Sequence, residues 1–297
     1  MSNTLNGVFL SAISQASLPH LTSMFAPLRG ITTDFSTDIA TAGSSVTTRF
    51  ATKPSVQDIT SVGYAPSAAQ TTARTINLDQ HLGVTIGFTD IEVLQSSISF
   101  ERLFLNPMLD ALGSAVFGAL NDLVTASNFS NYYFSTAANF DRSDLIDIGA
   151  TLTSTLQAPK SGRFALLNNA YYGALLKTLN AAEIPGITAD KAEGVVPRVT
   201  AFDVYESNLV DGNSENLAGF CGHSSALIMA ARRVNPEAAM QDSIEIAEVV
   251  IPGLGLPVTF RRFYDRSLGQ TCIHCGIIFG VAKGTGMGVR VVSVQPS

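Results

Sequence analysis

The longest helical pattern in the chain lies between Ser99 and Ser127. Apolar residues recur there in steps of three and four, which places them in one stripe along a helix: Leu105, Met108, Leu109, Leu112, Val116, Leu120 and Leu123. Asn106 before Pro107 is a typical start signal, because Asn caps free N–H groups and Pro fits the first helical position. The pattern predicts a long helix over about residues 107–126 and a separate turn at 100–105.

Two alternating segments before this helix enclose a polar loop. Val46, Thr48 and Phe50 alternate with polar neighbours, and a second alternation covers residues 73–78. The loop between them reads KPSVQDITSVGYAPSAAQ. A hairpin with so few apolar residues cannot stabilise itself. Residues 45–78 therefore predict a long hairpin that lies against a neighbour, within the chain or outside it, and residues 81–94 predict a half-buried strand.

The remainder of the chain alternates between short helical and strand patterns. We expect helices at 144–156 and 169–179, the second capped by Asn168 or Asn169, and strands at 162–167, 195–206, 258–264, 271–281 and 288–294. Periodicity does not decide whether residues 217–232 form a strand or a short helix, and Glu245 and Glu248 have the spacing of one helix face. The order of elements predicts an α+β fold in which both C-terminal strands return to the long helix.

Composition narrows the class of protein. Charged residues make up only 14% of the chain, against ~25% in typical domains, while 46% are hydrophobic. Few charges on a well-packed chain favour burial against other subunits. The net charge of −6 and the lack of a basic tract argue against a tight, sequence-independent grip on nucleic acid.

Targeting signals and disulfides are not indicated either. No run of about 18 apolar residues predicts a membrane span. The N-terminus has no Lys or Arg before its apolar patch, which makes a poor signal peptide. Three cysteines, an odd number, argue against a disulfide framework. We therefore expect a soluble protein made in a reducing cytoplasm.

One group of Cys and His residues could bind a metal ion, but the same residues could also serve only in packing. Cys221, His223, Cys272, His274 and Cys275 could in principle form a tetrahedral zinc site. The alternation of TCIHCGIIFG, however, points Cys272 and Cys275 to opposite faces of a strand, and free cysteine is commonly buried. Structural cysteines are the preferred interpretation. The chain has no Gly-x-Ser-x-Gly motif, and the glycine-rich KGTGMG lacks the ending of a phosphate loop.

In this order, the elements resemble those of a tailed-phage major capsid protein of the Hong Kong 97 type. Three segments within residues 30–294 carry the resemblance: TINLDQHLGVTIGFTDIEVLQSS, GRFALLNNAYYGALL and CGHSSALIMAARR. The resemblance implies an N-terminal arm (1–44), an extended loop formed by a β-hairpin (45–80), a peripheral domain (81–145 plus 271–297) with the spine helix at about 107–126, and an axial domain (146–270).

The resemblance also implies a function and partners. It implies a structural protein that self-assembles through pentamers and hexamers into an icosahedral head around double-stranded DNA, built in the host cytoplasm with a scaffolding protein, a portal and decoration proteins. DNA would be contacted weakly, and no enzyme activity, cofactor or membrane is implied. Contacts between subunits are expected at Arg49, Lys53, Asp58, Tyr64 and Arg74.

Three features keep alternatives open. Some members of the family cross-link subunits through a lysine in the extended loop; here only Lys53 lies there, without an identified Asn partner. No long, charged scaffolding segment precedes the arm, so the chain is either full length with a separate scaffold or already mature. The alternatives in function are the shell of an encapsulin-like nanocompartment and, in a different class, a metal-binding enzyme that uses the Cys/His group.

Overall fold

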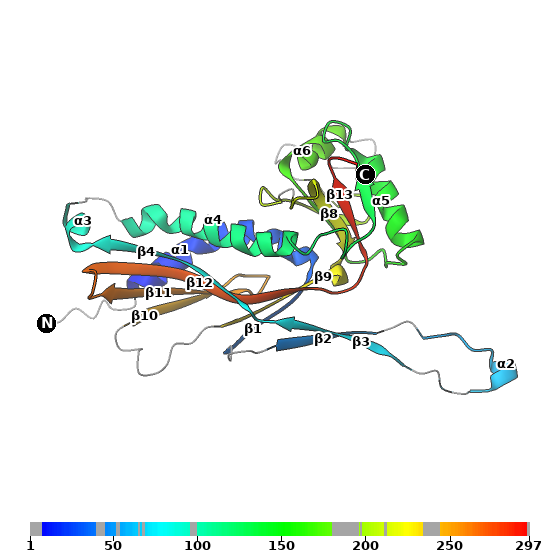
Figure 1. Cartoon of the computed structure of the whole chain (residues 1–297), viewed down its shortest axis with the longest axis horizontal. Helices are drawn as coiled ribbons and strands as arrows, with labels where there is room; N and C mark the ends of the chain where they lie inside the picture. The colour runs from blue at the N-terminus through cyan, green and yellow to red at the C-terminus, as the bar shows by residue number, and fades with distance from the viewer. Residues whose placement is uncertain are drawn as a thin grey trace.

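The computed structural model describes residues 8–39, 45–51, 54–64, 66, 69–95, 100–179, 196, 198–210, 213–233 and 244–295. The fold is α+β, as predicted. Figure 1 shows an elongated body, with a hairpin projecting from one end and a smaller layered part set above it near that end. The elongated body is called the lower unit here, and the smaller part is called the upper unit.

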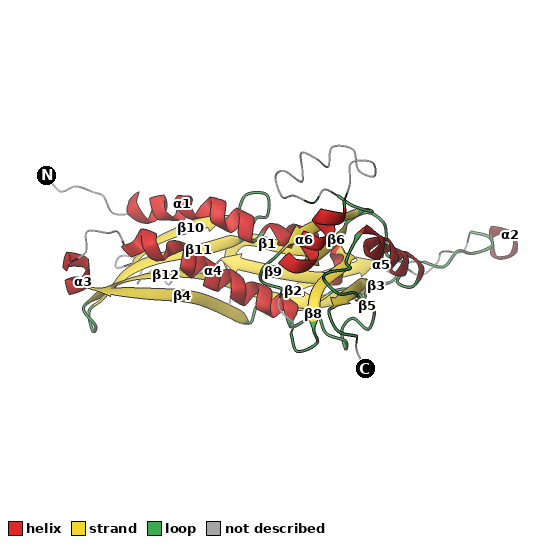
Figure 2. Ribbon diagram, turned by 90° about the horizontal axis from the view of Figure 1, so that it is seen from above, coloured by secondary structure: helices red, strands yellow, loops and turns green. Residues whose placement is uncertain are grey.

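The lower unit is built on a six-stranded sheet with the order β1-β9-β12-β11-β10 and with β4 paired to β12. Its strands are β1 (Thr32–Ile39), β4 (Gln80–Thr89), β9 (Leu227–Arg233), β10 (Ile244–Val250), β11 (Pro257–Asp265) and β12 (Gln270–Lys283). Helices α1 (Val8–Met24) and α4 (Phe100–Asn121) lie side by side over one face of this sheet (Figure 2). Short helices η1 (Ala26–Gly30) and α3 (Asp90–Gln95) complete the unit.

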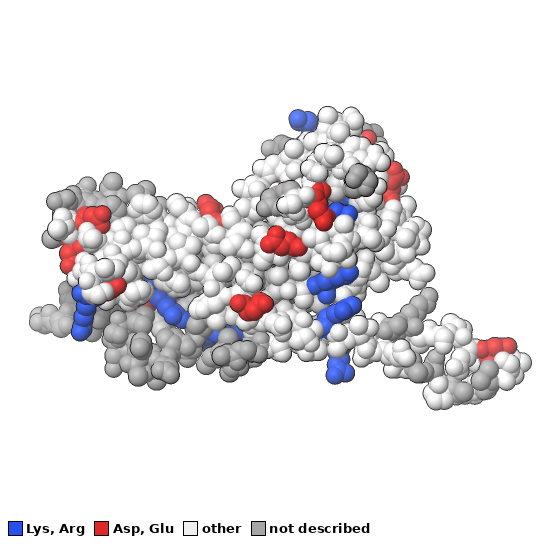
Figure 3. Space-filling view, in the orientation of Figure 1, with Lys and Arg blue, Asp and Glu red and all other residues white. Residues whose placement is uncertain are grey.

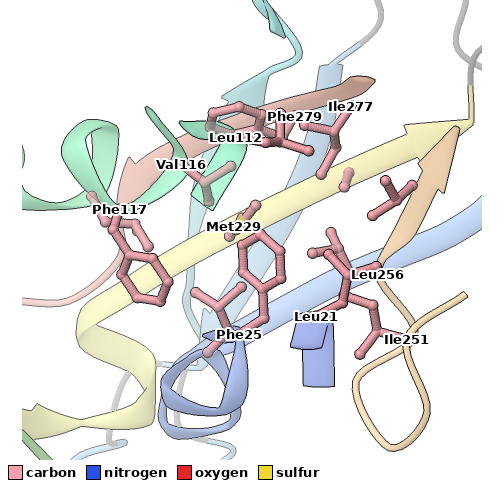
Figure 4. Packing of buried hydrophobic residues seen from close by; sticks show 14 of the residues in the cluster. Leu21, Phe25, Leu112, Val116, Phe117, Met229, Ile251, Leu256, Ile277 and Phe279 are labelled. Carbon is pink, nitrogen blue, oxygen red and sulfur yellow. The ribbon is translucent and has the colours of Figure 1, made fainter. Parts of the chain in front are cut away.

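The apolar stripe of α4 forms the centre of the core. Leu109, Leu112 and Val116 are fully buried with Ile277 and Phe279 of β12 in one hydrophobic cluster. Figure 4 shows Leu112 close to Phe279 and Ile277, with Val116 on the same helix and Leu21 of α1 further along the same cluster. The predicted packing of the helix against the strand at 271–281 is confirmed. Among the described residues, no helix is both long and apolar enough to cross a membrane.

The expectation for the last strand is wrong. β13 (Gly288–Val292) does not lie under α4 but pairs with β8 in the upper unit, where Val289 and Val291 enter a second core. The cause is the turn after Lys283: Gly284 and Thr285 bond back to the carbonyls of Ala226 and Ser225, so the chain changes sheets there. Strands β9, β10 and β11, expected in the axial segment, pair instead in the sheet beneath α4.

The upper unit is a five-stranded sheet in the order β5-β13-β8-β6-β7, with helices against one face. Its other elements are β5 (Tyr132–Phe134), α5 (Arg142–Ser154), β6 (Arg163–Leu167), α6 (Asn169–Thr178), β7 (Phe202–Glu206), β8 (Leu217–His223) and the 3-10 helix η2 (Ser224–Ala226). Asn168 caps α6, as one of the two predictions had it. The undecided segment 217–232 consists of two strands, β8 and β9, joined by η2.

Two further predictions differ from the structure. Helix α4 begins at Phe100 rather than at Pro107, and Pro107 lies inside it on the exposed side, where water can bond the carbonyl that loses its donor. The segment with Glu245 and Glu248 is strand β10 rather than a helix face. Arg262 on β11 and Arg233 on β9 pair with these two carboxylates, so packing in the sheet decides the conformation.

Candidate assembly surfaces

The predicted hairpin is present and is fastened to the lower unit only at its base. Strands β2 (Ser45–Ala51) and β3 (Thr71–Asn77) pair in antiparallel register from Ser45 opposite Asn77 to Ala51 opposite Thr71. Ile76 is fully buried in a small cluster with Ile228 and Ala230 of β9. These β9 residues lie on the sheet face turned away from α1 and α4, which we call the underside. The hairpin therefore starts in the layer beneath the sheet.

A close backbone approach fixes this base. A Cβ atom on Gly280 of β12 would lie only 1.9 Å from the carbonyl oxygen of Asn77, so no residue but glycine fits there without movement. Nearby, Nε of Arg74 donates a hydrogen bond of 3.1 Å to the carbonyl of Gly284. Contacts that lie 200 residues apart in sequence thus set the direction of the hairpin.

Beyond the base, the hairpin carries apolar residues that the described chain does not cover. At the tip, Asp58 caps the one-turn helix α2 (Ile59–Val62) by accepting the N–H of Thr60, and Gly63 ends it with a φ of 67°. Val56 and Tyr64 are 95% and 92% exposed, and Ile59 is exposed as well. The tip is therefore ordered locally while presenting apolar side chains to solvent.

The expected contact residues are spread along the hairpin rather than gathered in one cluster. Arg49 is exposed in the middle of β2, Asp58 and Tyr64 lie at the tip, and Arg74 lies near the base. Lys53 falls outside the described residues. Sequence reasoning missed Val56 and Ile59, although single apolar residues within a polar loop were the available signal. Their role in contacts between subunits stays a prediction.

The surface in view is otherwise poor in charge. Figure 3 shows a face on which Lys, Arg, Asp and Glu are scattered among many uncharged residues, with an acidic group at the far end of the hairpin, over α2. A weakly charged face favours burial against another protein more than contact with a polyanion.

The underside of the sheet carries a group of basic side chains. His274 on β12 lies directly opposite Arg261 on β11 and Thr85 on β4, and its Nδ1 is 2.8 Å from the Thr85 hydroxyl. Its imidazole lies across Gly83 and Gly276, where a Cβ atom would clash with it. Burial, then Arg261 and His81, lower the pKa of His274. The ring is therefore kept mainly neutral at pH 7.

Two of the carboxylates described on this face are paired with arginines, whereas Asp265 of β11 accepts hydrogen bonds from Ser267. Asp34 of β1 lies 3.3 Å from Arg232, and Glu248 of β10 lies 2.7 Å from Arg233. For Arg261, the structure gives no ion pair within the described residues, and its Nε is buried without a hydrogen-bond partner. Among the described residues of this face, Arg261 is thus an arginine without a carboxylate partner.

The cysteines and histidines singled out from sequence are not brought together. Cys221 lies in the core of the upper unit, whereas Cys272 and Cys275 lie in the lower sheet, Cys275 in the core beneath α4. Nδ1 of His223 is bonded within its own turn, by the backbone N–H and the hydroxyl of Ser225. Within the described ranges, no three His, Cys, Asp or Glu side chains are placed to hold a metal ion.

The thiols also lack the environment of a reactive cysteine. Burial raises the pKa of Cys221 and of Cys275 to about 12 in each case, so both are protonated at neutral pH. Cys272 has its pKa raised as well, first by burial and then by the charge of Asp265. These positions support packing rather than nucleophilic or redox chemistry.

Two buried arginines in the upper unit hold neighbouring segments together by hydrogen bonds. Arg163 donates to the carbonyls of Gly149, Ala158 and Pro159, which closes the C-terminal end of α5. Arg290 of β13 lies 2.7 Å from Glu215 and donates to the carbonyl of Phe129. Neither arginine was selected from sequence, because only the fold shows that they are buried.

Comparisons with known proteins give structural matches alone. No family model matches the sequence, and no curated protein matches it. Among solved structures, the chain is similar to one from Mycobacterium phage Che8 (17% identity, 84% of each chain, TM-score 0.55). It is also similar to chains in the capsid of cyanophage P-SCSP1u (12% identity, 92% of this chain and 88% of that one, TM-score 0.59) and in the mature capsid of bacteriophage PhiM1 (12%, 91% and 87%, TM-score 0.55). The chain has the fold found in these phage capsid structures.

Proposed function

We propose that this chain is the major capsid protein of a tailed phage, of which many copies assemble into an icosahedral shell around double-stranded DNA. One observation carries the proposal: within a fold shared with phage capsid chains, a hairpin with almost no core of its own presents Val56, Ile59 and Tyr64 uncovered at its tip. Exposed apolar groups on an ordered projection mark a surface that another molecule covers. A contact between a projection and a different surface of the next copy is heterologous, and such contacts generate rings and shells.

The Hong Kong 97 division into four parts is proposed with two changes. The N-terminal arm (1–44) and the extended loop (45–80) keep their boundaries. Strand pairing supports placing β9, β10 and β11 with β4, α4 and β12 in the peripheral domain, and β13 with the axial domain. The two cores, one around α4 and one around α5 and α6, follow the same division.

The proposed partners follow from this role. Copies of the chain would meet in pentamers and hexamers, with contacts at Arg49, Lys53, Asp58, Tyr64 and Arg74. A scaffolding protein, a portal and decoration proteins would join them in the host cytoplasm. Packaged DNA would be contacted weakly, in keeping with the net charge of −6.

The test is assembly of the purified chain, followed by light scattering and negative-stain imaging. Deleting Ser55–Ala69 should leave a folded subunit that forms no closed shells. Replacing Val56, Ile59 and Tyr64 by Ser should have the same effect, whereas Gln70→Ala, an exposed change in the same loop, should not. Normal shells from the deletion variant, or only small oligomers from the wild type, would refute the proposal.

The contents of the particles separate the two kinds of shell. DNA in particles isolated from cells supports a phage head, whereas an enclosed protein cargo supports a nanocompartment. Among the described residues, the Cys/His group is not gathered into one site, because Cys221 lies in the core of the upper unit and Cys275 in that of the lower unit.

A further inference from the structure

The upper unit carries a surface groove of about 470 Å³ beside α5, the helix along its right edge in Figure 1. Leu145, Ile146 and Ala150 of α5 contribute aliphatic walls, and the turn at Thr200 and Ala201 contributes a further wall. Ile146 is 48% exposed, so it presents apolar surface to whatever enters. The volume lies in the range of protein ligand sites, which is about 300–1,000 Å³.

A buried arginine with a spare donor also lines this groove. Arg163 is only 2% exposed, and the structure gives it no carboxylate partner within the described residues. Its Nε donates to the carbonyl of Pro159, and Nη1 donates to the carbonyl of Gly149. Nη2 donates to the carbonyl of Ala158 and to the hydroxyl of Thr153. A guanidinium has five N–H groups, so one on Nη1 is left for an anion from outside the described residues.

Two more polar groups of the groove lack partners among the described residues. Lys160 is exposed at the groove, without an ion pair in the described ranges. Thr200 has a buried hydroxyl that makes no hydrogen bond. It lies with Ala201 in a two-residue turn closed by hydrogen bonds between Val199 and Phe202, and both turn residues have left-handed φ values, 48° and 72°. Strained backbone that holds an unpaired polar group is typical of a ligand site.

A glycine in the middle of α5 leaves the guanidinium open to the groove. A Cβ atom at Gly149 would lie 3.7 Å from Nη1 of Arg163 and 3.4 Å from the ring of Phe202, which is ordinary contact in both cases. Alanine would therefore fit at this position and would stabilise the helix, but its methyl group would stand beside the spare donor. The absent side chain thus gives a ligand access to Arg163.

We propose that this groove binds the apolar C-terminal residue of a partner protein, with the terminal carboxylate facing Arg163 and Lys160. A carboxylate matches a guanidinium and an ammonium group in charge and geometry. The aliphatic walls would receive the last side chain, which a bare phosphate lacks. The hydroxyl of Thr200 favours a ligand with a second polar group, which the last peptide bond of a protein supplies and a fatty acid does not. The inference goes beyond the proposed function and does not depend on shell assembly.

Peptide binding to the full-length protein tests the ligand. The probe is a fluorescein-labelled tetrapeptide that ends in leucine with a free carboxylate, followed by fluorescence polarisation. The same peptide with a C-terminal amide should bind about tenfold more weakly or less, because a hydrogen bond to a charged group has at least this effect. Octanoate and inorganic phosphate should compete poorly. Equal binding of acid and amide, no binding of either, or octanoate or phosphate competing as well as the unlabelled peptide would overturn the inference and leave the proposed function standing.

Variants that keep the fold test the place of binding. Gly149→Ala should weaken binding of the acid peptide by about tenfold or more without lowering the thermal unfolding midpoint. Gly173→Ala in α6, where no atom lies within 4 Å of the Cβ position, is the matched control and should bind like the wild type. Lys160→Gln should weaken binding by about two- to fivefold, as for an exposed ion pair, and Lys160→Arg should restore it. Unchanged affinity in Gly149→Ala, or an equal loss in Gly173→Ala, would refute the site.

Discussion

Gly280→Ala is expected to loosen the hairpin from the body. The added Cβ would lie 1.9 Å from the carbonyl oxygen of Asn77 and 3.0 Å from a methyl group of Ile76. Ordinary contact begins near 3.4 Å, so one strand must move by about 1.5 Å. Asn77 and Ile76 both belong to β3, and the closer of the two groups is a backbone carbonyl. Rotation of a side chain therefore cannot relieve the overlap.

The expected cost follows from what that movement exposes. Ile76 is fully buried, and full burial of such a side chain stabilises by about 1.5–3 kcal/mol. Overpacking of a well-filled site costs a similar amount, about 1–3 kcal/mol. Partial lifting of β3 should therefore reduce the free energy of unfolding by about 1–3 kcal/mol, and it should change the exit angle of the hairpin.

The assay combines urea denaturation of the unassembled subunit with hydrogen exchange. Gly280→Ala should lower the unfolding free energy and speed exchange in residues 71–77, while residues 105–120 of α4 keep their relative protection. The matched control is Gly118→Ala within α4: no atom lies within 4 Å of its Cβ position, so the same substitution should stabilise the helix by about 1 kcal/mol.

Two results would refute this reasoning. Wild-type stability of Gly280→Ala with unchanged exchange in β3 would mean that the close approach does not hold the hairpin. Destabilisation spread evenly over the chain would mean that β12 yields rather than β3.

Three further predictions concern the lower unit. Leu112→Ala should destabilise by about 2–5 kcal/mol in urea unfolding, because Leu112 is buried on the sheet-facing side of α4, whereas Leu268→Ala at an exposed turn should change stability by less than about 0.5 kcal/mol. Replacing Cys272 or Cys275 by Ala should cost about 1–3 kcal/mol each and leave zinc binding absent by metal analysis; stoichiometric zinc with unfolding by a chelator would contradict this. The pKa of His274 is lowered by folding, so its contribution, present above the ordinary histidine pKa, should be lost as pH falls from 7 towards 5; His274→Asn should flatten that decline in denaturation midpoints.

Local patterns predicted most of the elements because short-range physics determines them. The stripe through Leu109 and Leu112 identified the buried face of α4, and the alternation in β2 and β3 identified the hairpin together with its need for a neighbour. Asn168 was recognisable as a cap because its side chain bonds within its own turn. Each of these inferences requires only neighbouring residues.

Tertiary packing decided the cases in which prediction failed. Asn106-Pro107 is a good start signal, yet the preceding residues continue the helix and the proline is tolerated at the surface. Glu245 and Glu248 fit a helix face until arginines from neighbouring strands pair with them in a sheet. β13 has the same apolar alternation as β12, and alternation alone cannot say which of two sheets a strand joins.

The basic group on the underside of the lower sheet could not be predicted from sequence for a related reason. His81 and Arg261 are 180 residues apart and meet only because β4 and β11 flank β12. Individually, each is an ordinary residue of a half-buried strand. The tip, by contrast, is contiguous, so its polar loop could be recognised at once.

Strand β12 contributes both to the core of the subunit and to the surface from which the hairpin leaves. Its core-facing residues Ile277 and Phe279 pack beneath α4, while on the underside Gly280 receives the base of the hairpin. Six residues earlier, His274 lies on that same underside, opposite Arg261. A subunit whose α4 has not packed against β12 cannot hold its outgoing hairpin in place. We therefore infer an order in which the core around α4 forms first and contacts between copies follow, so that Leu112→Ala should slow assembly even under conditions in which most subunits remain folded.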